Sequence, residues 1–398
     1  MRRLLCLLPL LLVAAAPPPR PVAIADRDPG VAVLAPDAED RWVPFNLTPG
    51  NQIRFGMTVD GRALTAILDT GVSYSVLARR SPAFDASRAI ASGNATAIGG
   101  AVAIAWMPTR TMVVGGLTRT GGGISVADLP AIATGSATAV DLLVGRDLIG
   151  GQALDIDYAA HRFRLIRSGR MPFRGAVAPL WISTERHVYE SELTLGGQRL
   201  NPVVVDTGDG SSITVTSQGW SAAGMSALPS TTALSFGLAG PVVSGLAVVP
   251  TLGLGDLQAR SVEVRIEPAN GFSQSIGTAG RIGSGFLQNY RVLLDPGARH
   301  MVLSPGPTAD RPPLRSTTGI LSGLSKDRIR VLHVMKNSPA EQAGWKQGDT
   351  ICSIDGQPIT PAYPTSTLAN WSVAPPGTVV KLGLCDGTLR PLTARAFY

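Results

Sequence analysis

The sequence predicts a mainly β protein with two similar halves and a smaller C-terminal domain. Three observations support this prediction. Short apolar runs broken by turn residues dominate a chain with 45 Gly and 31 Pro among its 398 residues, and no long helical heptads occur. A strand–turn–strand unit that ends in Asp-Thr-Gly occurs twice. A proline-rich stretch then precedes a C-terminal region with a different pattern of strands and helices.

The N-terminal segment 1–25 is predicted to be a signal peptide. Two arginines precede the apolar run 4–16, which is too short to span a bilayer comfortably, and small-residue cleavage sites lie at the end of this run (14–16) and at 23–25. The second site is favoured because a proline directly after the cut is disfavoured. An uncleaved N-terminal anchor is the alternative. No later run is long and apolar enough for a membrane span, so we expect a periplasmic or secreted protein.

Composition narrows the classes of partner and cofactor. The formal net charge is +7, but no run of Lys and Arg with interleaved aromatic residues occurs, so no nucleic-acid partner is expected. The chain has no Gly-x-Ser-x-Gly nucleophile elbow on a strand–turn–helix and no phosphate-binding Gly-x-x-x-x-Gly-Lys-Ser/Thr loop. No two histidines have metal-ligand spacing, so we expect neither a metal nor a cofactor. The four histidines are His161, His187, His300 and His333.

The middle of the chain contains an internal repeat. Residues 57–71 and residues 193–208 each read as a strand, a glycine-containing turn and a second strand that ends in Asp-Thr-Gly. This order is typical of a β-hairpin. A duplicated unit of this kind indicates that each copy belongs to a larger repeated structure.

The spacing downstream of the repeat also agrees between the two copies. Gly145 lies 76 residues after Asp69, and Gly283 lies 77 residues after Asp206. An apolar residue precedes each of these glycines. Agreement to one residue over such a distance indicates duplication. The two predicted halves are residues 40–168 and residues 175–305.

The C-terminal region is predicted to be a separate domain. Residues 306–315 (G-P-T-A-D-R-P-P-L-R) have the composition of a linker. Residues 316–398 then read as a strand, a short capped helix, a strand that ends in a turn, a second helical segment and a late strand. This mixture of helices and strands predicts a small α+β domain.

Two Asp-Thr-Gly turns at matched places predict a catalytic pair, Asp69 and Asp206. One such turn alone is more simply an Asx-type turn after a strand. Hydrolysis of an amide without a metal or a covalent nucleophile requires a water molecule held between two carboxyl groups, one ionised and one protonated. Like charges about 3 Å apart cannot both ionise, so such a pair shares one proton.

The residues next to each aspartate are predicted to support the pair. Gly71 and Gly208 allow a close approach of the backbone. Thr70 and Thr207 can form hydrogen bonds between the two turns and stiffen both of them.

These motifs resemble those of the pepsin and retropepsin superfamily of aspartic peptidases. The chain as a whole is similar to bacterial exported proteins that fuse two retropepsin-like halves to a PDZ domain. The matching segments are I-L-D-T-G-V-S (67–73), V-V-D-T-G-D-G-S-S (204–212) and the apolar-Gly elements at Gly145 and Gly283. The resemblance implies two closed β lobes related by pseudo-two-fold symmetry, with an extended polypeptide substrate between them.

The resemblance also implies that β-hairpin flaps cover the cleft. The glycine-rich candidates for the flap tips lie at Gly99 and Gly100 in the first half and at Leu238 and Ala239 in the second, and such tips suit a mobile lid. Ordinary hairpin turns are the alternative.

The sequence departs from the family pattern in two respects. The residue after each triplet is commonly Ala or Ser in the family, but here it is Val72 and Asp209. Asp209 adds a third carboxylate near the pair, and we predict a solvated turn residue there rather than one that raises a pKa in the site. The flap tyrosine characteristic of pepsins is also missing.

The C-terminal region resembles a PDZ domain of the bacterial form. The matching segments are N-S-P-A-E-Q-A-G (337–344), G-D-T-I (348–351) and I-D-G (354–356). Such domains bind an extended C-terminal peptide by strand addition, with the terminal carboxylate in a backbone nest. A purely structural or regulatory module is the alternative.

The PDZ resemblance implies two further features. The candidate carboxylate-binding loop contains Gly319, Ile320 and Leu321. The strands that carry Cys352 and Cys385 are expected to be neighbours, so a disulfide between them is geometrically plausible.

The sequence therefore predicts an aspartic-type endopeptidase that acts on an extended polypeptide, with a PDZ domain that recruits or gates the substrate. The alternative is a non-catalytic peptide-binding protein with a degenerate peptidase cleft and a PDZ module.

Overall fold

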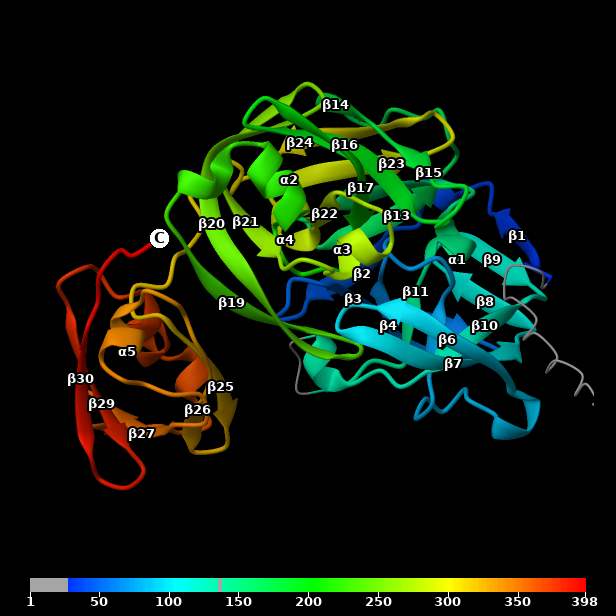
Figure 1. Cartoon of the computed structure of the whole chain (residues 1–398). Helices are drawn as coiled ribbons and strands as arrows, with labels where there is room; N and C mark the ends of the chain where they lie inside the picture. The colour runs from blue at the N-terminus through cyan, green and yellow to red at the C-terminus, as the bar shows by residue number, and fades with distance from the viewer. Residues whose placement is uncertain (1–27, 135–137) are drawn as a thin grey trace, which may run out of the picture.

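The computed structural model describes residues 28–134 and 138–398 of the protein (Figure 1). The predicted signal peptide 1–25 lies outside the described residues. Within them the chain is mainly β, which confirms the predicted fold class at that level. The α-helices are short: α1 (Arg146–Ile149), α2 (Ser217–Ala222), α3 (Phe272–Ser275), α4 (Ser284–Leu287) and α5 (Pro339–Gln342).

The largest sheet contains sixteen strands. They are β1 (Val31–Leu34), β2 (Val43–Leu47), β3 (Ile53–Val59), β4 (Arg62–Leu68), β5 (Val76–Ala78), β6 (Ile90–Ala97), β7 (Gly100–Pro108), β8 (Thr111–Val114), β9 (Leu117–Thr120), β10 (Gly123–Ala127), β11 (Leu142–Val144), β12 (Ala153–Asp157), β13 (Arg162–Ile166), β14 (Ala176–Pro179), β23 (Tyr290–Asp295) and β24 (His300–Pro305). The main path is β14-β24-β23-β12-β13-β2-β3-β4-β11-β5-β10-β7-β6.

The second sheet contains eight strands in the order β15-β16-β17-β22-β18-β21-β20-β19. They are β15 (Trp181–Ile182), β16 (Tyr189–Leu195), β17 (Gln198–Asp206), β18 (Ile213–Thr216), β19 (Ser230–Gly237), β20 (Gly240–Leu254), β21 (Leu257–Glu267) and β22 (Gly280–Gly283). The third sheet has six strands, β25 (Ile320–Ser325), β26 (Arg328–Val334), β27 (Thr350–Ile354), β28 (Gln357–Pro358), β29 (Val379–Leu384) and β30 (Leu389–Thr393).

The strands around the two Asp-Thr-Gly segments pair in the same way in both halves. β4 pairs in parallel with β11, β11 pairs antiparallel with β5, and β5 pairs in parallel with β10. In the second half, β17, β22, β18 and β21 make the same three types of pair in the same order. A short helix follows directly in each half, α1 after Gly145 and α4 after Gly283.

Two-residue turns close the hairpins that lead to the aspartates. Asp60-Gly61 joins β3 to β4, and Gly196-Gly197 joins β16 to β17; all four residues have positive φ. Glycine and aspartate adopt this backbone at low cost, and it matches the twist of a two-residue hairpin. Burial increases along both second strands, so each strand carries its Asp-Thr-Gly segment into the interior.

The two halves share one sheet and one core. β12 of the first half pairs with β23 of the second, and a continuous cluster of buried apolar side chains extends through both halves. The first half begins before the predicted residue 40, because β1 pairs with β9. The sequence did not indicate this strand, since its side chains are mostly exposed.

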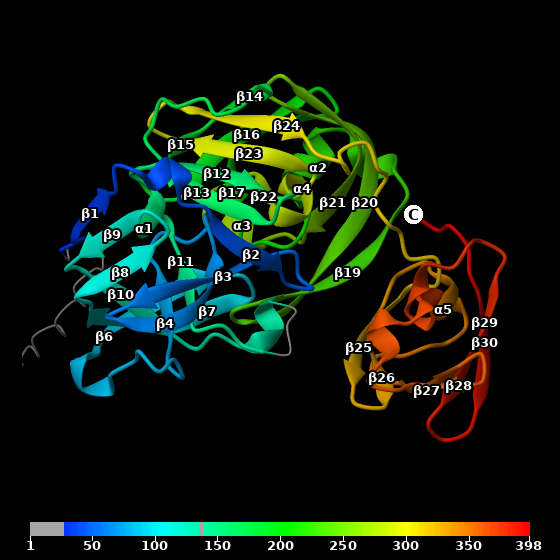
Figure 2. The ribbon, with the colours of Figure 1, turned by 180° about the vertical axis from the view of Figure 1, so that it is seen from behind.

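The C-terminal sheet has a core of its own, built around Val331, Ile351 and Leu382. It lies beside β19 and β20 at the end of the second sheet (Figures 1 and 2). In the predicted linker 306–315 the side chain of Leu314 is 79% exposed. Helix is scarce in this region: α5 has four residues, and the predicted second helical segment is a 3-10 helix, Thr367–Val373.

Candidate active site

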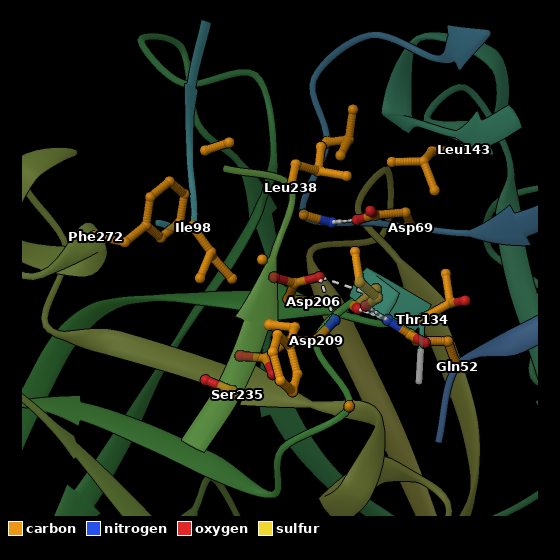
Figure 3. Close-up of a pocket in the computed structure, with 18 of the residues that line it drawn as sticks. Gln52, Asp69, Ile98, Thr134, Leu143, Asp206, Asp209, Ser235, Leu238 and Phe272 are labelled. Carbon is orange, nitrogen blue, oxygen red and sulfur yellow. Dashed lines mark hydrogen bonds between the residues drawn. The ribbon is translucent and has the colours of Figure 1, made fainter. Parts of the chain in front are cut away.

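The two predicted catalytic residues lie together on the wall of one cavity (Figure 3). Asp69 directly follows β4, and Asp206 is the last residue of β17. Both are buried, with 9% and 7% exposure. The cavity has a volume of about 480 Å³, which lies within the usual range of ligand-binding pockets, about 300–1,000 Å³.

The two threonines connect the loops reciprocally. The Thr70 N–H donates to Thr207 Oγ1 (3.1 Å), and the Thr207 N–H donates to Thr70 Oγ1 (3.0 Å). Each hydroxyl then donates across to the opposite strand, Thr70 to the Val205 carbonyl (2.6 Å) and Thr207 to the Leu68 carbonyl (2.8 Å). All these groups are buried, so each loop depends on the other for its hydrogen bonds.

The two glycines make room for the carboxyl groups. A Cβ atom on Gly71 would lie 2.4 Å from Cγ of Asp206, and one on Gly208 would lie 2.2 Å from Cγ of Asp69. Each carboxyl group therefore lies against the opposite loop. The N–H of Gly71 donates to Asp69 Oδ1 (3.1 Å), and the N–H of Gly208 donates to Asp206 Oδ1 (3.0 Å), which orients both groups.

Burial and mutual proximity raise both carboxyl pKa values. Desolvation raises the pKa of Asp69 well above its ordinary value; the charge of Asp206 and a hydrogen bond between the two carboxyl groups act in the same direction. Burial, followed by the charge of Asp209, raises the pKa of Asp206 to about 6, although Arg281 opposes this rise. The raised pKa of Asp69 favours its protonated form, and Arg281 favours the negative charge on Asp206.

The prediction of a solvated Asp209 is wrong. Its carboxylate is buried and accepts hydrogen bonds from Arg281 Nε (2.8 Å) and from the Ser211 hydroxyl (2.7 Å). Burial alone would raise the pKa of Asp209, but Arg281 and Ser211 outweigh it and hold that pKa below its ordinary value. Asp209 is therefore a buried anion beside the pair.

Arg281 and Glu267 complete a buried charge cluster that the sequence analysis missed. Arg281 Nη1 donates to Glu267 (2.6 Å), and its Nε lies 4.0 Å from Asp206 Oδ2. The sequence signal for this cluster was an arginine inside the buried strand β22, at the position where the first half has Leu143. A comparison of the two repeats position by position would have found it.

The loop after Asp69 is held by a second buried ion pair that was also missed. Asp147 accepts hydrogen bonds from the N–H and the hydroxyl of Ser75, both at 2.7 Å. Arg119, which is 2% exposed, donates to the other oxygen of Asp147 at 3.1 Å. On the opposite side, the amide of Gln52 donates to the Gly208 carbonyl (2.9 Å) and ties the second loop to the first half. These residues position the loops.

The predicted flap residues lie in two hairpin tips that touch each other. Ile98-Gly99 joins β6 to β7, and Leu238-Ala239 joins β19 to β20. The Ala239 N–H donates to the Ile98 carbonyl at 3.2 Å. Gly99 has φ +96°, and a Cβ atom there would lie 3.0 Å from the backbone of Ala239. Ile98 and Leu238 line the same cavity as the aspartates (Figure 3).

In the C-terminal sheet, Ile320 and Leu321 begin the edge strand β25, directly after Gly319. The N–H groups before them already have acceptors within the chain: Thr318 donates to the Ser372 carbonyl (3.4 Å), and Gly319 donates to the Ser316 hydroxyl (2.9 Å). A carboxylate nest formed by these two N–H groups would require the loop to rearrange.

Cys352 in β27 and Cys385, directly after β29, form a disulfide with a Cα–Cα distance of 5.0 Å, and these two strands are paired. Within residues 28–134 and 138–398, no group of three or more His, Cys, Asp or Glu side chains is arranged to hold a metal ion. None of the helices in this described part of the chain is long and apolar enough to cross a membrane.

No protein-family model matches this sequence, and no curated protein matches it.

Proposed function

We propose that this protein is an aspartic-type endopeptidase. One observation carries the proposal: Asp69 and Asp206 meet in one cavity on two loops that are joined by reciprocal threonine hydrogen bonds. Two buried carboxyl groups with raised pKa values are the groups required to activate a water molecule for attack on an amide. In this proposal the halves are two retropepsin-like lobes related by pseudo-two-fold symmetry.

The environments of the two aspartates suggest their roles in the free enzyme. Arg281 lies 4.0 Å from Asp206, so the ionised group at neutral pH is Asp206 and the protonated group is Asp69. Asp206 then takes a proton from water while the oxygen of that water bonds to the substrate carbonyl carbon. Asp69 donates its proton toward the carbonyl oxygen. The tetrahedral intermediate collapses when Asp206 gives its new proton to the nitrogen, the C–N bond breaks and Asp69 takes back a proton from a hydroxyl of the intermediate, so that the two groups interchange roles as acid and base.

The hairpin tips provide the lid in this mechanism. Contact between Ile98 and Ala239 closes the cavity above the carboxyl pair, which excludes bulk water. An extended substrate has to enter while the tips are separated, and their closure then orients it.

The C-terminal sheet is proposed to be a PDZ-like domain that recruits a polypeptide or gates access to the cleft. β25 is an edge strand of this sheet. Its unpaired edge suits the addition of a peptide strand through backbone hydrogen bonds, as in PDZ domains. The proposed location is the periplasm or the extracellular medium, after removal of the N-terminal signal peptide.

The test is cleavage of denatured proteins and peptide libraries by the wild type and by Asp69→Asn and Asp206→Asn. Loss of cleavage in both variants, with unchanged circular dichroism and melting behaviour, would support the proposal. No cleavage by the wild type from pH 4 to pH 9, together with retained peptide binding, would favour the alternative of a non-catalytic peptide-binding protein. That alternative would hold if Asp206 were paired with Arg281, which lies 4.0 Å from it, instead of acting together with Asp69.

A further inference from the structure

The wall of the cavity differs in chemistry between the two halves. Leu143 pairs with Val76 and Ile67, whereas Arg281 pairs with Thr214 and Val204, so Leu143 and Arg281 occupy matched positions. Ser125 pairs with Val76, and Arg265 pairs with Thr214, so Ser125 and Arg265 also occupy matched positions.

Further matched positions follow the same rule. Ala127 corresponds to Glu267, because their strand partners Ala78 and Thr216 each come two residues after the matched pair Val76 and Thr214. Val72 corresponds to Asp209, since each directly follows its Asp-Thr-Gly triplet. At these matched positions the first half therefore presents apolar or small side chains to the cavity, and the second half presents charged ones.

Most of these charges already have partners. Asp209 accepts from Arg281 and from Ser211, and Glu267 accepts from Arg281 and from the Ser273 N–H (2.8 Å). These contacts occupy both oxygens of each carboxylate and hold the guanidinium of Arg281 in place. The Nε and Nη1 atoms of Arg281 therefore already have acceptors within the chain.

Arg265 is the exception. Its Nε and Nη1 atoms are buried and have no hydrogen-bond partner, although the residue lines the cavity. Glu263 lies on the same face of β21 and its charge interacts with that of Arg265, but no ion pair of 4.0 Å or less joins the two among the described residues. Buried guanidinium donors without an acceptor carry a free-energy cost that a bound acceptor would remove.

Ser244 provides a second donor on the same wall. Its hydroxyl is buried, has no partner and lines the cavity. β20 pairs with β21 so that Leu246 lies opposite Arg265, which places Ser244 one step diagonally from Arg265 on the same face of the sheet. A planar guanidinium next to a hydroxyl is a donor set that suits a carboxylate.

We propose that Arg265 and Ser244 form a subsite for a carboxylate of the substrate, on the second-half side of the cleft, while the first half accepts an apolar side chain. This inference rests on the proposed peptidase function and adds to it a substrate class: polypeptides cut near an acidic residue on one side of the scissile bond and an apolar residue on the other. The carboxylate comes either from an Asp or Glu side chain or from the C-terminus of a short substrate.

The test compares peptide libraries that differ in one position at a time. We expect wild-type kcat/KM to be about ten- to hundredfold higher for Asp or Glu than for Asn or Gln at one fixed position near the cut, the effect of one charged hydrogen-bonded contact. Arg265→Met should remove this difference between the acidic and the amide peptides, and Arg265→Lys should restore part of it. Arg260→Met, an exposed arginine on the same strand, is the matched control and should leave the preference unchanged.

Two further arms separate the possible outcomes. Peptides with free and with amidated C-termini distinguish a terminal carboxylate from a side-chain carboxylate. Cleavage with no preference for acidic residues, or a preference that survives Arg265→Met, would overturn the subsite and leave the peptidase proposal intact. If no peptide is cut, fluorescence polarisation with labelled acidic and amide peptides tests the subsite alone: acid-selective binding lost in Arg265→Met supports it, and equal binding overturns it.

Discussion

Two aspartates with the same sequence motif have different neighbours. Asp206 lies beside an anion, Asp209, and a cation, Arg281, whereas the residues at the matched positions near Asp69 are the apolar Val72 and Leu143. This difference makes the two carboxyl groups inequivalent, because Arg281 stabilises the negative charge on Asp206.

Each member of the charge cluster should be needed for stability only while the other members are present. We expect Arg281→Leu to lower the free energy of unfolding by about 3–5 kcal/mol, because it leaves the buried carboxylates of Asp209 and Glu267 without their cation. The triple variant Asp209→Val/Glu267→Ala/Arg281→Leu carries the residue types of the first half and should recover most of this loss. Urea denaturation at pH 7 measures both. A triple variant as unstable as the single one would contradict this account.

The raised pKa of Asp206 also predicts how stability depends on pH. Because folding raises this pKa from 3.8 to about 6, the contribution of Asp206 to stability is fully present below pH 3.8 and is lost as the pH rises through 6. The amide in Asp206→Asn does not titrate. Between pH 4 and pH 8 the variant should therefore gain up to about 3 kcal/mol relative to the wild type.

Thermal or urea unfolding at the two pH values measures this difference, with Asp40→Asn as the control for loss of an exposed carboxylate. A stability difference between Asp206→Asn and the wild type that is the same at pH 4 and pH 8 would show that Asp206 titrates normally in the folded protein.

At the scale of strands and turns, the two hairpin tips meet through a backbone hydrogen bond and close glycine contacts, and the proposed mechanism makes them the lid of the cavity. We expect Gly99→Ala to lower kcat/KM for a peptide substrate several-fold, since a Cβ atom there presses on the backbone of the opposite tip. Gly61→Ala is the matched control: Gly61 also has positive φ (+80°), but a Cβ atom there meets nothing within 4 Å.

Gly61→Ala should therefore lower stability by about 1 kcal/mol and leave kcat/KM unchanged. Steady-state kinetics on both variants decides the matter: equal kinetic effects would indicate backbone strain alone and would remove the lid role of the Gly99 tip.

Local signals in the sequence predicted the elements that carry the site. The Asp-Thr-Gly triplets, the Gly-containing turns and the positions of the hairpin tips are all readable within short windows. The pairing of β12 with β23 is not, because it joins residues more than a hundred positions apart through the shared core. The role of Arg281 was missed for a related reason: its partner Asp209 comes from the loop after β17 and its partner Glu267 from the end of β21, and only the fold brings the three together.

For the molecule as a whole, the C-terminal sheet rests on the base of the β19–β20 hairpin, whose tip lines the cavity. Thr232 Oγ1 forms a hydrogen bond with His333 Nε2 (2.8 Å), and Thr231 donates to the Lys336 carbonyl (2.6 Å). Ala233, Leu246, Met335 and Tyr398 form a small apolar cluster between them. The sheet thus contacts the strand whose far end carries Leu238.

This contact should restrain the hairpin. We expect Met335→Ala to speed amide hydrogen exchange in residues 234–243 by several-fold, because removal of a buried side chain loosens the cluster under β19 and β20. The exposed Met171→Ala is the control. Hydrogen-exchange mass spectrometry with unchanged exchange in this hairpin would show that the C-terminal sheet does not restrain it.

The central claim is that Asp69 and Asp206 act as one catalytic pair. The most direct measurement is the pH dependence of kcat/KM for one cleaved peptide, in the wild type and in the two Asn variants. The account expects wild-type activity to rise as the pH increases through about 6, where Asp206 ionises, and to fall again at higher pH when Asp69 loses its proton. Neither variant should show measurable activity. Cleavage that persists in either variant, or that shows no loss below pH 6, would contradict the account.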